Sequence, residues 1–461
     1  MLSAAKGPDA SIVPSGTTLT YTRPSILTDQ LQSYQLNSEN SQVTSANGNT
    51  IVFLAGIAGE LFLIELKGTF ADNSPADVGQ VSGTVESMEV FSAGGSLLFG
   101  IDFYGSPVNV SQVMAQWPNY AVNDDNIIVV DSPIGTPARF NTNSSNDSVS
   151  HIATGNGEDY VRGGVEAELI DGGNANDTLV GQDGNDTLIG GAGDDVLDGG
   201  SGFDISQYSG DQSSYTVQLS PSGITIMDRR PSQDGTDTLV DVELLQFSDA
   251  SFDISIRSGA ANLSPGDFAA IVDLYIAYFD RAPTSKGLLY WADRLEDGMP
   301  LSEVAESFFV QSETQSTYAA YLNADGSLNN TEAFVNAVFN NVLGRDPSGP
   351  YWINELDTNP DITPAIFILA VLNGAKAASG SPVDAAYLAD KTDIGVYFSA
   401  IKGLSDYDDT VSVMGMFDGS AASVTNAVAA IDQIYADALD PNMGEFLLPL
   451  VGVIDDPFAV A

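Results

Sequence analysis

Short runs of alternating apolar and polar residues, separated by Gly, Asn and Ser, fill the first third of the chain. This period of two predicts β-strands, so we expect an all-β, sandwich-like module over residues 1–140 with its apolar faces packed together. The Ser- and Asn-rich residues 141–153, which include His151, predict a linker. The expected strands are Thr17–Thr22, Ile51–Leu54, Leu61–Phe70, Val81–Phe91, Ser96–Phe103 and Asn126–Val130.

From residue 154 the pattern changes to a strict period of nine. Residues 154–207 read TGNGEDYVR, GGVEAELID, GGNANDTLV, GQDGNDTLI, GGAGDDVLD and GGSGFDISQ, without an insertion. A polar Gly-rich linker would not keep this period. Apolar residues hold the eighth position, as Val161, Ile170, Leu179, Leu188 and Leu197. Every nonapeptide has an acid at its sixth position, and these acids are Asp159, Glu168, Asp177, Asp186, Asp195 and Asp204.

This pattern resembles the nonapeptide of the RTX (repeats-in-toxin, hemolysin-type calcium-binding repeat) family. The resemblance implies a parallel β-roll in which two nonapeptides complete one coil. Glycines allow the positive φ angles that tight turns need, and the next three residues form a strand whose eighth-position side chain points inward. The turn glycines whose main chain the family uses for metal binding correspond to Gly155, Gly157, Gly164, Gly173, Gly184, Gly191, Gly193, Gly200 and Gly202.

Two columns of carboxylates follow from this coil, because the sixth position recurs on one edge in every second nonapeptide. Stacked coils bring successive acids within about 5 Å, and such columns need a cation between the turns. Calcium suits an irregular cage of oxygen ligands, and we expect about four Ca²⁺ ions. Glu166, Ala175 and Gln182 replace turn glycines, and Glu168 lengthens one acid. The expected ligand pairs are Asp159/Asp177, Asp177/Asp195, Glu168/Asp186 and Asp186/Asp204.

Residues 208–257 return to β character and resemble the segment that closes RTX rolls. Its expected role is to cover the open apolar end of the stack, as repeat arrays require. The acids of this segment are assigned to turns rather than to further metal sites.

Residues 264–440 predict a helical domain. Ser264 precedes Pro265 as a helix N-cap, and apolar residues then recur at helical spacing. A divergent internal repeat places Arg281 and Arg345 before equivalent prolines and tryptophans, and resembles the helical domain-of-unknown-function family 4214. An Arg beside a Trp could form a carbohydrate subsite. We prefer an Arg stacked on a Trp that holds a helix C-terminus to the next helix.

The composition excludes several classes of function. The chain of 461 residues has 62 Asp and Glu against 15 Lys and Arg, a net charge of −47, with no Cys and one His. A surface of this sign repels nucleic acid and anionic lipid, so neither nucleic-acid binding nor membrane insertion is expected. Disulfides, thiolate metal sites and zinc protease motifs are excluded, and His151 is expected to be a solvated linker residue.

The tail, residues 441–461, ends in Asp455, Asp456 and a short apolar run, and resembles an uncleaved type I export signal. No N-terminal signal peptide and no membrane span is recognised. We therefore expect a secreted, extracellular or cell-surface protein that is exported by type I export machinery. Its expected role is non-enzymatic and structural, in a surface layer, matrix or adhesion, with self-assembly or a cell-surface glycan as partner. The alternatives are a secreted carboxylate-based glycan-active enzyme and, ranked lower, a toxin.

Overall fold

The computed structural model describes residues 151–255 and 262–459 and, before residue 151, the main chain of seven strands. The chain divides into two compact units. Unit 1 comprises Met1–Gly210 and Pro231–Phe252, and unit 2 comprises Asp211–Arg230 and Asp253–Ala461. Each unit therefore contains two separate stretches of the chain.

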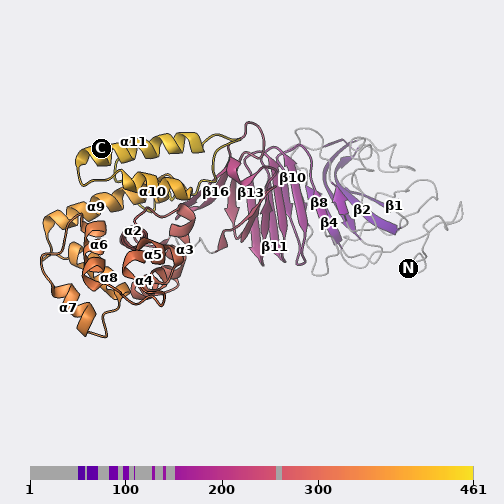
Figure 1. Ribbon diagram of the computed structural model, residues 1–461. Coiled ribbons are helices and arrows are strands. Elements are labelled where there is room, and N and C mark those ends of the chain that lie inside the picture. The colour runs from indigo at the N-terminus through magenta and orange to yellow at the C-terminus, as the bar shows by residue number, and fades with distance from the viewer. Residues whose placement is uncertain are drawn as a thin grey trace. The chain divides into compact units, whose positions relative to one another are not determined.

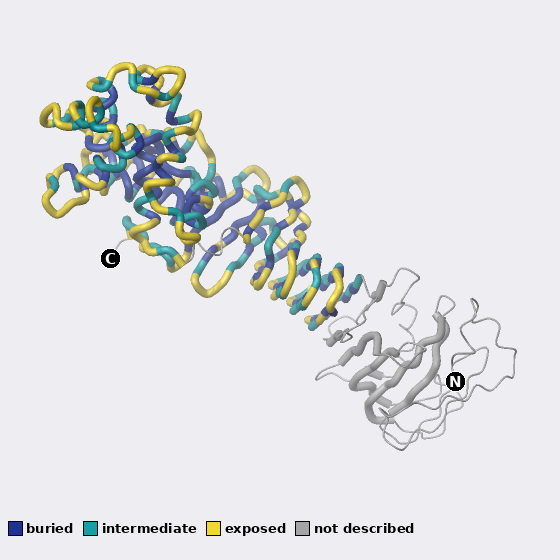
Figure 2. The backbone as a smooth tube through the Cα atoms, turned by 90° about the horizontal axis from the view of Figure 1, so that it is seen from below, coloured by how far each residue is buried: buried dark blue, intermediate teal, exposed yellow. Residues whose placement is uncertain are grey.

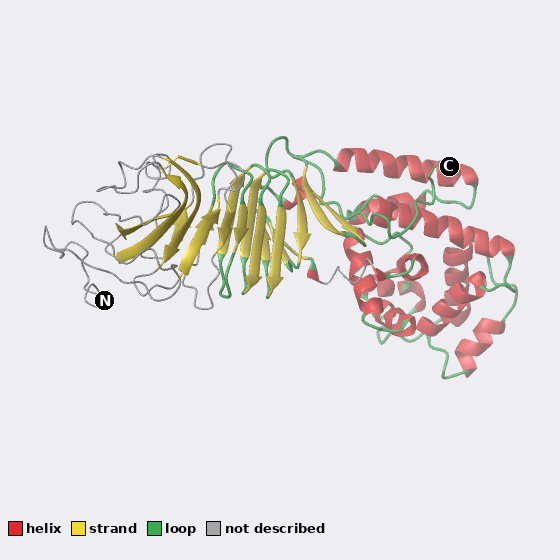
Figure 3. Ribbon diagram, turned by 180° about the vertical axis from the view of Figure 1, so that it is seen from behind, coloured by secondary structure: helices red, strands yellow, loops and turns green. Residues whose placement is uncertain are grey.

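The described core of unit 1 is a parallel β-roll (Figures 1 and 3). Its strands are β8 (His151–Ala153), β9 (Tyr160–Arg162), β10 (Leu169–Asn174), β11 (Thr178–Asp183), β12 (Thr187–Ala192), β13 (Val196–Ser201), β14 (Ile205–Gln207), β17 (Thr236–Val240), β18 (Leu244–Gln246) and β19 (Ser251–Asp253). Through residue 207, each strand pairs in parallel with the strand two places along the chain. Leu169 lies opposite Thr187, and Thr178 opposite Val196. The prediction of two nonapeptides per coil is confirmed.

The eighth position of every nonapeptide lies in the interior of the roll. β11 and β12 each bury their second and fourth residues and leave the residues between them partly accessible, so buried and accessible positions alternate along the coils (Figure 2). The column also continues past both predicted ends of the repeat, with Ile152 before it and Leu239 and Leu245 after it. The predicted members, all completely buried, are Val161, Ile170, Leu179, Leu188 and Leu197.

The parallel pairing begins before the predicted start of the repeats. β8 pairs with β10, with His151 opposite Leu169, and two earlier strands, β6 (Ile127–Val129) and β7 (Arg139–Asn141), pair in parallel with β8 and β9. Part of the segment assigned to a linker is therefore a strand. His151 is half-buried within this strand, so it does not lie in a solvated linker.

Five further strands precede β6, and they pair with one another in antiparallel fashion. Their positions agree with the predicted strands near residues 51, 61, 81 and 96. The predicted strand Thr17–Thr22 lies outside the described residues, and the sandwich arrangement stays a prediction. The five are β1 (Thr50–Ile57), β2 (Glu60–Phe70), β3 (Gly83–Phe91), β4 (Leu97–Asp102) and β5 (Val108–Asn109).

The roll is interrupted once and then resumes. The chain leaves it after Gln207, contributes residues 211–230 to unit 2, and returns near Pro231. β17 then pairs in parallel with β13, and β18 with β14. The segment predicted as a cap therefore contains one more coil of the roll.

Unit 2 is helical and also contains the hairpin β15 (Tyr215–Ser220) and β16 (Gly223–Asp228). Ser264 caps α2 as predicted, because its hydroxyl accepts from the Asp267 N–H. A short π-helical turn, Tyr397–Ile401, follows α9. The helices are α2 (Pro265–Phe279), α3 (Ser285–Glu296), α4 (Leu301–Phe309), α5 (Ser312–Thr317), α6 (Thr331–Leu343), α7 (Tyr351–Thr358), α8 (Pro364–Lys376), α9 (Pro382–Val396), α10 (Tyr407–Gly415) and α11 (Ala421–Ala438).

The internal repeat of unit 2 is visible in its contacts. α2 and α6 both end in a left-handed residue, and an arginine follows each end. Arg281 donates to Glu313 in the first turn of α5 (2.9 Å), and Arg345 donates to Asp384 in the first turn of α9 (2.7 Å). An acid in a first turn also complements the positive end of its helix. The two arginines therefore make equivalent structural contacts.

The arginine is not stacked on a tryptophan as predicted. The Arg281 guanidinium lies over the rings of Tyr275, Phe279 and Tyr407, at 5.0, 5.3 and 4.8 Å from their centroids. Trp291 instead packs on Phe308 with 4.9 Å between ring centroids. The alternative interpretation, a carbohydrate subsite, gains no support from this arrangement.

The tail packs within unit 2. The Val217 N–H donates to the Leu447 carbonyl (2.8 Å), and the Val451 N–H donates to the Leu219 carbonyl (2.8 Å), which adds a parallel strand segment to β15. Leu447 and Leu448 are completely buried. Among the described helices of the whole chain, none has the length and apolarity to cross a membrane.

Replacing Leu188 with Ala should destabilise the roll by about 2–5 kcal/mol, because a completely buried side chain would leave a cavity between two sheets. Urea denaturation in saturating calcium, followed by the far-ultraviolet β signal, measures this loss. Val196→Ala is the control, since Val196 is 38% exposed on the outer face of β13. Equal losses for the two variants would contradict the assigned interior.

Candidate metal centre

The sixth-position acids join neighbouring coils through their first carboxylate oxygen. The N–H of Asp159 donates to Oδ1 of Asp177, and the N–H of Asp177 donates to Oδ1 of Asp195, each at 2.7 Å. In the second column, the N–H of Glu168 donates to Oδ1 of Asp186 (2.8 Å), and the N–H of Asp186 donates to Oδ1 of Asp204 (2.7 Å). We call each such linked pair a rung. The structure thus brings together the four predicted pairs.

In four of these acids the second carboxylate oxygen is buried and has no hydrogen-bond partner. This holds for Oδ2 of Asp177, Asp186, Asp195 and Asp204, in side chains that are at most 2% exposed. A buried carboxylate oxygen without a partner is strongly unfavourable unless the charge is neutralised or an ion is bound. Each of the four orphaned oxygens belongs to an acid of a predicted pair.

A glycine at the first position of each turn makes room for this second oxygen. A methyl group at Gly172 would lie 2.5 Å from Oδ2 of Asp177 and 2.8 Å from the Gly190 carbonyl oxygen of the next coil. At Gly181 the methyl group would meet Oδ2 of Asp186 in the same way, and the Gly199 carbonyl oxygen at 2.6 Å. These first-position glycines were absent from the predicted site. Carboxylate and carbonyl oxygens therefore converge where a side chain would otherwise sit.

The predicted turn glycines serve the turns mainly through their backbone geometry. Gly173, Gly191 and Gly200 at the second position have φ between 92° and 98°. Ala175 and Gln182, which replace glycines, keep the positive φ, at 79° and 85°. Gly184, Gly193 and Gly202 at the fourth position also have positive φ. The main-chain bonds between coils therefore impose the turn even where the residue disfavours it.

The first coil uses its glycines differently. The carbonyls of Gly155 and Gly164 accept main-chain bonds from Asn174 (2.9 Å) and Asp183 (3.4 Å) of the next coil. Gly157, the remaining predicted glycine, is buried in the bend between β8 and β9, two residues before Asp159. Glu168 departs from the other acids, because its Oε2 accepts from the Gly164 N–H of its own turn at 3.2 Å, although its main-chain N–H still donates to Oδ1 of Asp186.

Burial dominates the electrostatics of the rungs. It raises the pKa of Asp177 to about 8 and that of Asp195 to about 6, although the N–H bond in each rung lowers it. Neighbouring acids of the column raise the pKa of Asp177 further. Burial also raises the pKa of Asp186 and Asp204. The charged carboxylates therefore need a positive partner.

The donor set fits a hard cation. Each rung offers carboxylate and main-chain carbonyl oxygens, and such ligands suit Ca²⁺ rather than a metal that prefers imidazole or thiolate. Within residues 151–255 and 262–459, no three His, Cys, Asp or Glu side chains gather in a metal-binding group. Two carboxylates per rung thus require main-chain oxygens to complete a cage.

Comparison with known protein families agrees with this geometry. The profile described as RTX calcium-binding nonapeptide repeat (4 copies) matches residues 171–205. The chain therefore carries RTX repeats. They lie within the β-roll and include the sixth-position residues Asp177, Asp186, Asp195 and Asp204. No match is found among curated proteins.

One solved structure with a partial likeness is the extracellular lipase LipA from Serratia marcescens. The match has 21% sequence identity and a TM-score of 0.18, and it covers 24% of this chain and 22% of the lipase chain. Less than a quarter of the lipase is thus matched, and the likeness says nothing about the activity of this chain.

Two acids beyond the RTX repeats continue the columns. The N–H of Asp195 donates to Oδ1 of Asp237 (3.0 Å), and the N–H of Asp204 donates to Oε2 of Glu243 (2.7 Å). The assignment of the cap acids to turns alone missed both. The signal was present at Asp237, since Gly235, Asp237 and Leu239 keep the spacing of the fourth, sixth and eighth positions.

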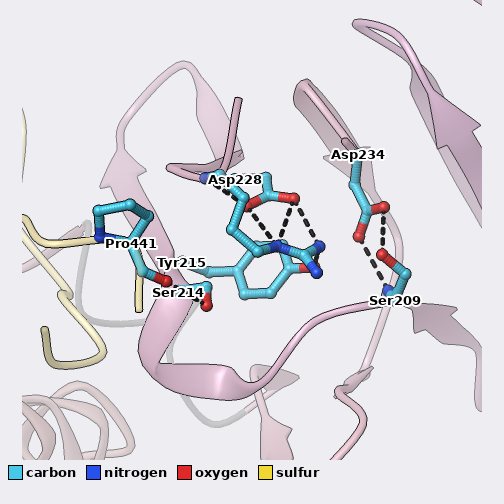
Figure 4. Close-up of polar contacts among 7 residues, drawn as sticks. Ser209, Ser214, Tyr215, Asp228, Asp234 and Pro441 are labelled. Atoms are coloured by element: carbon cyan, nitrogen blue, oxygen red, sulfur yellow. Dashed lines mark hydrogen bonds and ion pairs between the residues drawn. The ribbon is translucent and has the colours of Figure 1, made fainter. Parts of the chain in front are cut away.

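Other acids of this segment do hold local structure, as predicted. In unit 1 the Asp234 carboxylate accepts from the N–H and the hydroxyl of Ser209, at 2.8 and 2.7 Å (Figure 4). In unit 2 the buried Asp228 carboxylate pairs with Arg230, whose Nη2 also donates to the Tyr215 hydroxyl (Figure 4). These carboxylates already accept hydrogen bonds from protein donors. Unlike the second oxygens of the rung acids, they are therefore not candidates for calcium binding.

Replacing Gly181 with Ala should weaken calcium binding and lower the melting temperature in calcium. The added methyl group would collide with Oδ2 of Asp186 and with the Gly199 carbonyl oxygen of the next coil, which are two of the proposed calcium ligands. Calorimetric calcium titration and thermal melting measure the two effects. Gly374→Ala in α8 is the control, because the methyl group there would have open space. A Gly181→Ala protein with unchanged calcium affinity would contradict the proposed position of the oxygens.

In chelator, the stability of the roll should fall as the pH rises from about 4 to about 8. The folded-state pKa of Asp177 (about 8) and of Asp195 (about 6) lies above the ordinary value of 3.8, so the folded roll binds protons more tightly. The resulting stabilisation is present at low pH and disappears as the pH passes the folded pKa.

Thermal melting of the calcium-free protein across this pH range tests the prediction. Asp177→Asn should flatten the dependence, because it removes the group with the larger shift. In excess calcium the trend should weaken, since ion binding requires deprotonated carboxylates. A calcium-free melting temperature that increases towards pH 8 would show that these carboxyls do not titrate as described.

Proposed function

We propose that this chain is a secreted calcium-binding protein whose RTX roll folds when it meets extracellular calcium. The observation that carries the proposal is the set of four buried Oδ2 atoms without partners, each facing a first-position glycine. Calcium would be held by Asp159, Asp177 and Asp195 in one column, by Glu168, Asp186 and Asp204 in the other, and by main-chain carbonyls. About four ions are expected in these pairs.

The acidic residues of the roll make its folding depend on calcium. Residues 154–207 contain 12 acids and one Arg, so the uncompensated segment repels itself. The Asp N–H groups and Oδ1 atoms can form rungs only when the coils are stacked, and stacking buries the second oxygens. The bound ion supplies positive charge to those oxygens, and because the cage does not exist in the unfolded chain, binding energy becomes folding energy.

Free calcium is low in the cytosol. Extracellular modules bind calcium in the range on the order of 0.1–1 mM. The chain would therefore stay unfolded and exportable inside the cell and fold outside it. We propose the type I route for export, supported by the RTX repeats and by the acidic pair Asp455 and Asp456 in the tail. The location would be extracellular or on the cell surface.

For the folded protein we propose a non-catalytic structural role, as a surface-layer, matrix or adhesion component. The support comes from how unit 2 uses its buried charges: Asp273 pairs with Lys376 and accepts from Thr392 (2.6 Å), and Arg281 pairs with Glu313. These groups hold helices together, and such pairing removes them from acid or base chemistry. A self-assembly contact or a cell-surface glycan is the proposed partner.

Calcium titration should produce a cooperative gain of β signal in circular dichroism and a large rise in melting temperature over chelator. Light scattering on the same samples should show assembly at millimolar calcium. Asp186→Asn should shift the folding midpoint to higher calcium, because the amide keeps an acceptor for Glu168 but removes a charged ligand.

Asp194→Asn is the matched control for this titration. Asp194 is an exposed acid in the same type of turn, and its Oδ1 accepts from the Thr236 N–H, a bond that Asn can also make. This variant should leave the midpoint nearly unchanged. A wild-type protein with full β signal in chelator would overturn the folding switch, and a strictly monomeric protein in calcium would overturn the assembly role.

A further inference from the structure

We propose that the roll holds a further calcium ion beyond the RTX repeats, at the rung that joins Asp204 to Glu243. The main-chain carbonyl of Asp241 would be its third oxygen source. This inference rests on the proposed calcium function and extends it to a coil that the chain builds only after its excursion through unit 2.

The coil after the excursion has the same register as the repeats. Ile205 lies opposite Leu244, and Ser206 opposite Leu245, in parallel pairing. Glu243 thereby takes the place opposite Asp204, and its Oε2 accepts from the Asp204 N–H at 2.7 Å. The Asp204 carbonyl accepts in turn from the N–H groups of Glu243 (3.1 Å) and Leu244 (3.0 Å). An acid 39 residues away thus replaces the usual acid 18 residues away.

The oxygens at this rung repeat the arrangement found within the RTX repeats. At Gly172 and Gly181, an added methyl group would meet the orphaned Oδ2 of its own turn and the first-position carbonyl of the next coil. At Gly199 it would meet Oδ2 of Asp204 at 2.7 Å and the carbonyl oxygen of Asp241. Asp241 therefore supplies the carbonyl that a glycine supplies elsewhere.

Asp204 itself is the observation that points to a ligand. Its side chain is completely buried, and its Oδ2 has no hydrogen-bond partner. The charges around it are negative, because the acids Glu243, Asp198 and Asp241 all interact electrostatically with the Asp204 carboxylate. A cation at this rung would neutralise this local excess of negative charge.

The corresponding rung of the first column is built differently. Asp237 accepts from the Asp195 N–H. However, the three atoms nearest to a methyl group at Gly190 would all belong to Asp195, and none is a main-chain carbonyl oxygen of the next coil. The proposal is therefore confined to the second column.

Equilibrium dialysis against calcium, with elemental analysis of the full-length protein, tests the inference. Glu243→Gln should bind one ion fewer than the wild-type protein, because the amide keeps an acceptor for the Asp204 N–H while removing the charged ligand. Asp194→Asn, which also removes one acid near the end of the roll, should bind as many ions as the wild type.

The outcomes separate this inference from the proposed function. A wild-type protein that binds no calcium would overturn both. Wild-type binding with an equal number of ions in Glu243→Gln would overturn the inference alone. Should Glu243→Gln lack the β signal in saturating calcium, the wild-type count decides: about five ions support the further site, and about four or fewer overturn it.

Discussion

The roll depends on one constraint, the stacking of carboxylates at the spacing of neighbouring strands. Four sixth-position acids use Oδ1 to bond the coil before them and leave Oδ2 buried, and these are Asp177, Asp186, Asp195 and Asp204. The two oxygens make opposite demands, because the rung requires the acid in place and burial opposes its charge. A hydrophobic residue would remove the charge but would also remove the rung. A bound cation satisfies both oxygens, so the structure and the proposed ion dependence have the same origin.

The period of nine, together with the RTX resemblance that it carries, was sufficient to predict the coil, the interior column and the paired acids. It could not show what the first-position glycines do, since their role depends on oxygens brought in by other turns. Ala175 and Gln182 illustrate the same limit, because their positive φ comes from main-chain bonds to neighbouring coils. Glu243 was hidden for a further reason: the excursion breaks the period, and the turn before Glu243 no longer has the nonapeptide spacing.

In unit 2 the sequence revealed the duplication but not the partners of its arginines. Arg281 and Arg345 could be aligned through the prolines and tryptophans that follow them. Their acids lie 32 and 39 residues further along, at distances that differ between the two halves. A short motif carries no information about such contacts. The rings beside Arg281 come from Tyr275 and Phe279 of the preceding helix α2, which are closer in sequence than Trp291, and from Tyr407 of α10.

The path of the chain adds a requirement for folding: the excursion from the roll into unit 2 must close before the last coil of the roll can form. The last coil of the roll can pair with β13 and β14 only if the ends of the excursion come together, and closing a flexible loop has an entropic penalty that grows with its length. Within the excursion, β15 and β16 form a hairpin, which restricts the freedom of that loop. β15 also bonds residues 447–451, so part of this order comes from the far end of the chain. Completion of the roll and completion of unit 2 are therefore linked through the covalent chain, and ions that favour the last coil also reduce the freedom of the hairpin.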